Sequence, residues 1–338
     1  MSLRDKTLEE LEEMEAELSD QEAESGFANY SMKIDIYKEM VRKLELLIRQ
    51  RNKEYEDILE YVKRKLVFYL IHYGTYLKTE YQKDDHLAAS CLNNVLRYDR
   101  TNPIAPYRLG FLSYKNREYA EAIQFFQKAL ENDKYYPNHN YKLNGQQQLN
   151  AHLYLTNSAL RVANQAYENM KQLPDLSDVP KQEFSPLIEN ILINEQYLQR
   201  HAFYLVDETS KTTCSKADCE NLVDRPPLDT LLLYFNDRDI LMVFEEKMIT
   251  LSYNQGIMIR HFLLKSSEER PATRASFTSD IEENSYVQNV NRFRNKLREY
   301  GFPPIIQNKR YNNETAYYYN GAYPYKIMYR VDDEIEYA

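Results

Sequence analysis

The spacing of apolar residues changes along the chain and predicts several kinds of segment. Residues 1–26 carry a thin helical stripe of apolar side chains on an otherwise charged surface, which predicts a frayed or partner-dependent helix. From residue 32 to about 52, and again from 55 to 81, apolar side chains recur strongly at spacings of three and four. This pattern predicts two long antiparallel helices.

One block of the sequence recurs 34 positions further along: Ala88, Leu92, Leu96 and Asp99 return as Ala122, Phe126, Leu130 and Asp133. The best-formed unit runs from Pro103 to Asp133, with the small Gly110 where two helices would cross. This unit closely resembles the tetratricopeptide repeat, a helix-turn-helix that buries its apolar face by stacking on neighbouring repeats. The preceding unit resembles it more loosely, with Tyr73-Gly74 in place of the Leu-Gly pair.

The resemblance implies an α-solenoid over residues 30–205 that binds a peptide or protein on its inner surface. Seven polar residues are expected to face that ligand: Tyr107, Arg108, Lys115, Asn150, His152, Asn157 and Arg161. The alternative for any one of them is an ordinary solvent-exposed position on a helix.

A different pattern follows residues 206–228, which show no sustained period, contain Pro226-Pro227 and are predicted to be a linker. Three short apolar runs separated by polar turns then predict an antiparallel meander. Helical spacing returns in three stretches, and residues 304–320 read as a hairpin. The predicted strands are 230–235, 240–244 and 248–252, and the predicted helices are 254–265, 273–283 and 285–300.

This order of sheet, three helices and hairpin resembles the OmpR-type winged-helix domain of bacterial response regulators. The segment from Val290 to Leu297 (VNRFRNKL) is similar to the recognition helix of that family. The resemblance covers residues 228–325 and implies DNA binding. Asn308–Asn313 lacks the glycines of the family's wing, so the resemblance does not define the length of this hairpin.

The residue types of the last predicted helix agree with that implication. Arg suits guanine edges, and Asn or Gln suits adenine edges, in the major groove, while basic residues on a hairpin can hold phosphates. The expected DNA-binding residues are Gln288, Asn291, Arg292, Asn295, Lys296, Lys309 and Arg310. The alternative is a solvated helix face on a winged helix that binds protein.

The distribution of charge is uneven although the chain of 338 residues has a formal net charge of −9. Residues 1–26 hold ten acidic and two basic residues, whereas residues 284–311 hold six basic residues and one acidic residue. The C-terminal module therefore carries a local basic footprint. Low mean hydropathy, the lack of a long apolar run and the lack of a secretory leader predict a cytoplasmic protein without a membrane anchor.

Few residue patterns point to catalysis or metal binding. The seven glycines form no phosphate-binding loop, and the six histidines show no metal-ligand spacing. Cys214 and Cys219 have four residues between them and no second pair nearby, which favours free thiols over a zinc site. We therefore expect no enzymatic activity, no cofactor and no metal.

The sequence thus predicts a mainly helical protein, a TPR-like α-solenoid followed by a smaller α+β winged-helix domain. The expected divisions are an acidic segment 1–29, repeats 30–205, a linker 206–228, the winged helix 229–325 and a tail 326–338. It resembles a bacterial transcription regulator whose partners are double-stranded DNA, a peptide or protein ligand and a second copy in a homodimer. Two alternatives stay open: a non-enzymatic adaptor whose winged helix docks a protein partner, and an acidic N-terminus that mimics DNA and inhibits the chain's own winged helix.

Overall fold

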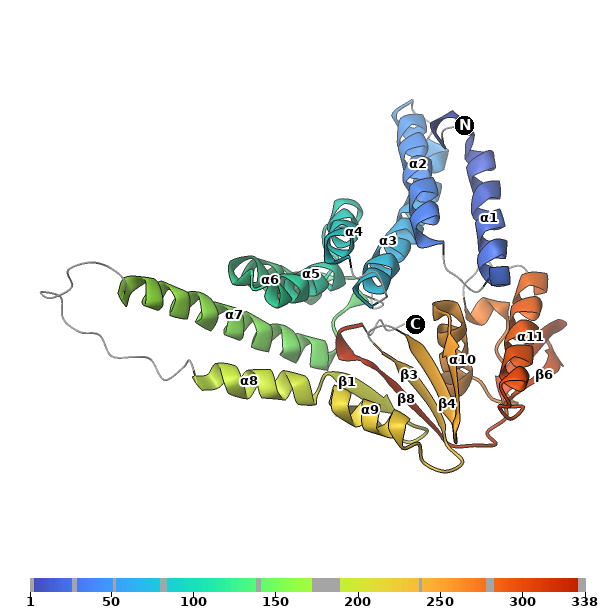
Figure 1. Cartoon of the computed structure of the whole chain (residues 1–338). Coiled ribbons are helices and arrows are strands. Elements are labelled where there is room, and N and C mark those ends of the chain that lie inside the picture. The colour runs from blue at the N-terminus through green and yellow to red at the C-terminus, as the bar shows by residue number, and fades with distance from the viewer. Residues whose placement is uncertain are drawn as a thin grey trace, which may run out of the picture. The chain divides into compact units, whose positions relative to one another are not determined.

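The computed structural model describes residues 3–25, 29–50, 53–79, 84–137, 141–171, 189–236, 239–277 and 283–333 (Figure 1). The chain is mainly helical, and its sheets lie in the C-terminal part. It divides into two compact units, residues 1–83 with 203–330, and residues 84–202 with 331–338. This division differs from the predicted boundaries, because the helices before residue 84 belong with the sheet. Within the described ranges, no helix has the length and apolar character needed to cross a membrane.

The N-terminal helices of the first unit are α1 (Leu8–Ser25), α2 (Tyr30–Arg49) and α3 (Glu56–Thr79). Thr7 and Glu10 cap the start of α1, since the backbone N–H of each donates to the side chain of the other. The two long predicted helices are confirmed as α2 and α3, which pack against each other. Their shared core is aliphatic and contains Ile36, Met40, Leu44, Val62, Leu66 and Leu70.

The predicted meander is confirmed as β3 (Leu231–Phe235), β4 (Ile240–Phe244) and β5 (Lys247–Leu251), paired antiparallel in sequence order. The runs LLLYF and ILMVF are apolar almost throughout because these strands are buried. The last strand alternates between exposed and buried residues, as expected where one face of the strand meets solvent.

Three further strands extend this sheet to the order β2-β1-β8-β3-β4-β5. Strand β8 (Tyr325–Arg330) lies parallel to β3 and antiparallel to β1 (Phe203–Val206), and β2 (Lys211–Cys214) forms the edge. The predictions of a linker at 206–228 and a tail at 326–338 were therefore wrong, since these ranges contain β2, helix α9 (Lys216–Asp224) and most of β8. Strand β2 and helix α9 lack the apolar runs that predicted β3 and β4, and β8 is ordered by distant partners.

The remainder of this unit consists of α10 (Tyr253–Lys265), α11 (Glu283–Glu299) and the hairpin β6 (Ile306–Tyr311) and β7 (Glu314–Tyr319). Asn312 and Asn313 both have positive φ, the conformation of a two-residue turn that asparagine tolerates well. Ala272 pairs with Tyr317 as an isolated bridge beside this hairpin. Of the helix predicted at 273–283, the described part is a short 3-10 helix, Arg274–Ser276, and residues 278–282 lie outside the described ranges.

The second unit contains α4 (Asp85–Tyr98), α5 (Ile104–Lys115), α6 (Tyr119–Tyr135), α7 (Gly145–Lys171) and α8 (Glu189–Arg200). Consecutive helices contact one another from α4 to α8. Gly110 allows α5 to approach α6 closely, because a Cβ there would lie 3.0 Å from the ring of Phe126. That ring is stacked on Tyr154 of α7, with 5.3 Å between centroids. One aromatic side chain thus joins three helices.

Candidate nucleic-acid interface

Helix α11 has one apolar side and one polar side. Tyr286, Val290, Phe293 and Leu297 are buried at helical spacing. The opposite side bears exposed Arg and amide side chains. Four of the predicted DNA-binding residues lie there: Gln288, Asn291, Arg292 and Asn295.

Two other side chains orient this exposed side. The Tyr317 hydroxyl donates to Asn291 Oδ1 over 3.4 Å, and burial raises the pKa of that phenol, so it stays protonated. Arg294 Nη1 donates to Asn308 Oδ1 of the hairpin over 3.2 Å, and its guanidinium lies 6.0 Å from the Tyr317 ring centroid. Helix and hairpin are therefore joined through Arg294 and Tyr317 next to the exposed amide.

The two predicted lysines have structural contacts instead of open positions. Lys296 Nζ donates to the Thr250 carbonyl over 3.0 Å and to Gln255 Oε1 over 3.2 Å, and burial lowers its pKa. Lys309 Nζ donates to the carbonyl of Glu268 over 2.8 Å. The sequence shows that these residues are basic, but it does not show that a flexible lysine side chain will donate to a backbone carbonyl. Both lysines thus hold the module together.

The hairpin adds an exposed polar edge to α11. On β6, Gln307, Asn308 and Arg310 are exposed, so the predicted position of Arg310 is available to a ligand. The prediction did not include Arg298, which is exposed in the last turn of α11. The interface that the structure assembles consists of Gln288, Asn291, Arg292, Asn295, Arg298 and Arg310, which we call the basic face.

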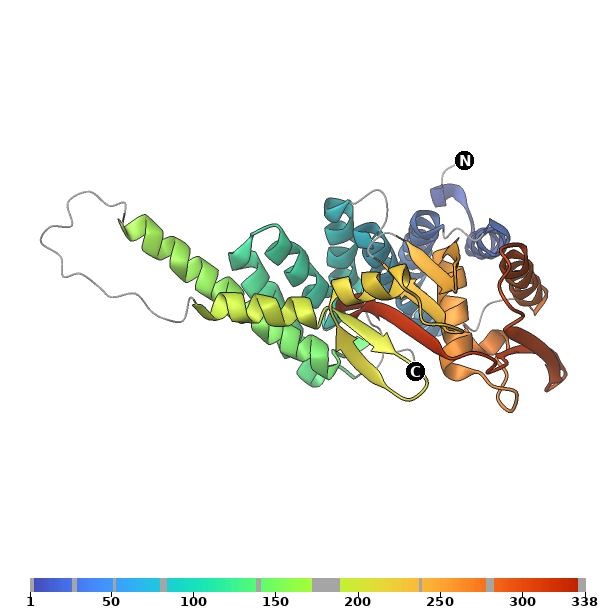
Figure 2. The ribbon, with the colours of Figure 1, turned by 60° about the horizontal axis from the view of Figure 1, so that its bottom comes forward.

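The acidic helix α1 lies against α11, as both views of the ribbon show (Figures 1 and 2). Its apolar stripe is buried at Leu11 and Leu18. A buried lysine of α2, Lys33, donates to Ser19 Oγ over 2.7 Å and pairs with Glu15 at 3.5 Å. Glu9, Glu12, Glu13 and Glu17 of α1 are exposed, and we call them its acidic face.

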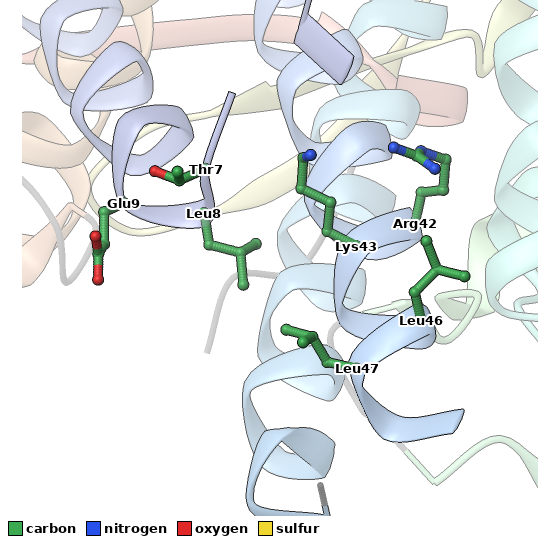
Figure 3. Close-up of a pocket in the computed structure, with 7 residues that line it drawn as sticks. All are labelled: Thr7, Leu8, Glu9, Arg42, Lys43, Leu46 and Leu47. Carbon is green, nitrogen blue, oxygen red and sulfur yellow. The ribbon is translucent and has the colours of Figure 1, made fainter. Parts of the chain in front are cut away.

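The start of α1 is not tightly packed onto α2. An open hollow of about 360 Å³ lies between the two. Figure 3 shows Leu8 opposite the last turns of α2. The hollow is lined by Thr7, Leu8, Glu9, Arg42, Lys43, Leu46 and Leu47. Because of this hollow, the N-terminal end of α1 loses few packing contacts when the helix detaches.

Four of the seven residues predicted to bind a peptide are buried inside the second unit. Tyr107, Arg108, Asn150 and Asn157 are each at most 2% exposed. Asn157 Nδ2 donates to the Tyr114 hydroxyl over 3.4 Å. Polar residues at these positions form an internal network, so they do not line an open groove.

The other three predicted residues lie nearer the surface. Lys115 pairs with Asp85 at 2.6 Å and Arg161 pairs with Glu195 at 2.9 Å. His152 is exposed and lines a hollow between α6 and α7.

The chain's own C-terminal segment occupies the buried side of α5 and α7. The short 3-10 helix Val331–Asp333 accepts a hydrogen bond from the Tyr107 hydroxyl to Asp332. Arg108 Nη2 donates to the Asp333 carbonyl over 3.3 Å, and Gln147 Nε2 donates to the Val331 carbonyl over 3.0 Å. These helices therefore bind an acidic helical turn, although it belongs to the same chain.

Among the residues that the structure describes, no group of three or more His, Cys, Asp or Glu side chains that could hold a metal ion comes together. Comparisons of the chain with protein-family models, with curated proteins and with solved structures find no match.

Proposed function

We propose that the chain is a transcription regulator that binds double-stranded DNA through α11 and the β6–β7 hairpin. The observation that carries this proposal is the basic face. It combines Arg and amide side chains, which are suited to base edges, with a hairpin arginine in reach of the backbone phosphates. The order of sheet, α10, bridge strand, α11 and hairpin also agrees with a winged helix.

In this proposal α1 hinders DNA from the side of α11 against which it packs, while the basic face itself stays exposed. A major groove admits one helix, and α1 would bring its acidic face toward the phosphates. Detaching α1 exposes Leu11 and Leu18, at a cost of about 1.5–3 kcal/mol each. Specific DNA contacts are worth about 4–10 kcal/mol over non-specific ones, so an operator can displace α1 where random DNA cannot.

The repeat-like helices supply the sensing part of the proposal. Their buried polar network binds Val331–Asp333, which directly follows β8 of the sheet. A peptide or protein that displaced this segment would act on the end of a central strand. Sensing and DNA binding would then be coupled through β8.

The experiment is a fluorescence-anisotropy titration of labelled duplex DNA with the chain lacking residues 1–26. A shorter fragment beginning after residue 225 would lose β1, which pairs with β8. Arg292→Ala is expected to weaken binding at least about fivefold, the lower limit for loss of one bidentate base contact.

Arg225→Ala is the matched control. It removes the same charge from an exposed position at the end of α9, across the sheet from α11 (Figures 1 and 2). Equal effects of the two substitutions, or no DNA binding at low salt, would refute the proposal and favour an adaptor that docks protein.

A further inference from the structure

Two cysteines meet at the corner between strand β2 and helix α9. Cys214 is the last residue of β2, and Cys219 lies in the first turns of α9. Ser215 caps the helix between them, because its Oγ accepts from the Asp218 N–H over 3.2 Å while Asp218 Oδ2 accepts from the Ser215 N–H over 3.0 Å. This capping box holds the two cysteines in a defined relation.

The thiols are in contact, with 3.4 Å between the two Sγ atoms. A disulfide requires about 2.05 Å, so small side-chain rotations complete the approach. The backbone at Cys214 is fixed by its pairing with Phe203 of β1. Cys219 is fully buried, whereas Cys214 is partly exposed. An oxidant from solvent therefore reaches Cys214 first, and Cys219 is placed behind it.

The surroundings assign different roles to the two sulfurs. The contact between the two thiols, in which either sulfur can donate, lowers the pKa of Cys214 and raises that of Cys219. The N-terminal end of α9 also favours a thiolate nearby, while the carboxylate of Asp218 opposes it. Cys214 is thus the sulfur that reacts first, and Cys219 stays protonated until it reacts as the second thiol.

We propose that Cys214 and Cys219 form a reversible intramolecular disulfide when the protein meets a peroxide. The Cys214 thiolate attacks one oxygen of hydrogen peroxide, the O–O bond breaks, and a sulfenic acid and hydroxide form. The Cys219 sulfur then attacks the Cys214 sulfur, the S–O bond breaks, and the released hydroxide takes up the Cys219 proton as water. The hydroxide of the first step takes up the proton that Cys214 released on ionising, so two thiols lose two electrons and one peroxide becomes two waters.

The disulfide would tie an edge strand to the helix beside it. Strand β2 is the edge strand, paired with β1, and none of its residues is buried, and α9 contacts β3 three strands further in. Oxidation therefore changes the freedom of one edge of the sheet and leaves the basic face of α11 untouched. For this reason the proposed disulfide does not depend on whether the protein binds DNA.

The test is peroxide treatment of the full-length protein, followed by alkylation, trypsin digestion and mass spectrometry. Trypsin cuts after Lys211 and Lys216, so the two cysteines fall in different peptides, and a disulfide yields a linked pair that separates on reduction. Cys91, buried in α4, serves as an internal control. We expect the linked pair to form at least about tenfold faster than Cys91 is oxidised.

Two variants separate the steps. Cys219→Ser should stop at a sulfenic acid on Cys214 that dimedone traps, and Cys214→Ser should leave Cys219 reduced. Either of two results would overturn the proposal in the wild type: Cys214 reaching sulfinic acid without the linked pair, or disulfides that join separate chains. Oxidation of Cys91 at a comparable rate would also overturn it.

Discussion

Replacement of Gly110 by alanine tests the close helix crossing that defines the repeat-like unit. A Cβ at this position would lie 3.0 Å from three atoms of the Phe126 ring, closer than ordinary contact. The ring cannot move aside easily, because Tyr154 stacks on it and Tyr107 meets it edge-on with centroids 6.0 Å apart. The substitution therefore forces a packed aromatic cluster to shift.

The expected magnitude follows from two opposing effects. Alanine is favoured over glycine inside a helix by about 1 kcal/mol, whereas inserting a group into a packed core costs about 1–3 kcal/mol, occasionally more. Because Phe126 is blocked on two sides, we take the upper part of the packing cost. Gly110→Ala should then lower the local stability by about 1–2 kcal/mol.

Hydrogen–deuterium exchange of peptides from α5 and α6 is the suitable assay, since a chain with two units need not unfold in a single transition. Gly145→Ala is the control, because a Cβ there meets nothing within 4 Å. In a Phe126→Leu background the cost of Gly110→Ala should shrink or change sign. Unchanged protection in Gly110→Ala, without coupling to Phe126, would refute the reasoning.

Three further predictions test other parts of the account. Deleting residues 1–26 should tighten binding to random duplex DNA at least about tenfold, and replacing the acidic face by glutamines should give part of that gain. Unchanged affinity in both variants would show that α1 does not hinder DNA binding. Tyr107→Phe removes a donor to the buried Asp332 and should lower stability in urea by about 1–3 kcal/mol, whereas Tyr135→Phe, at a side chain 83% exposed, should not. Equal urea midpoints for the two variants would contradict the docking of Val331–Asp333 on α5 and α7. Burial lowers the pKa of His261 from 6.5 to about 4. Folding stability should therefore fall as the pH drops between these values, because the unfolded chain takes up the proton first. A His261→Gln variant with the same pH dependence would disprove this cause.

Elements with a strong local pattern were predictable. The runs that became β3 and β4 are continuously apolar and are bounded by polar turns, and Asn312-Asn313 favours a two-residue hairpin turn. The buried positions of α11 follow helical spacing without exception among its described apolar core residues. In each case a few neighbouring residues determine the local structure, so no distant contact was needed to predict it.

Features that depend on distant partners were not predictable. Strand β8 is ordered by β1 and β3, far away in sequence, and nothing in its own residues distinguishes it from a tail. Helix α7 buries Gln147, Asn150 and Asn157 beside its apolar residues, contrary to the rule that polar residues face solvent. Their hydrogen-bond partners come from other helices and from the C-terminal segment, which spacing cannot reveal.

The salt dependence of DNA binding tests the central claim most directly. We would titrate the chain lacking residues 1–26 into labelled duplex DNA over a series of salt concentrations and plot the logarithm of the affinity against that of salt. With Arg292, Arg298 and Arg310 exposed on the basic face, the account predicts a slope of about −2 to −3 per bound chain, which becomes shallower by about 1 in Arg310→Ala. A slope near zero, or one that Arg310→Ala leaves unchanged, would contradict it.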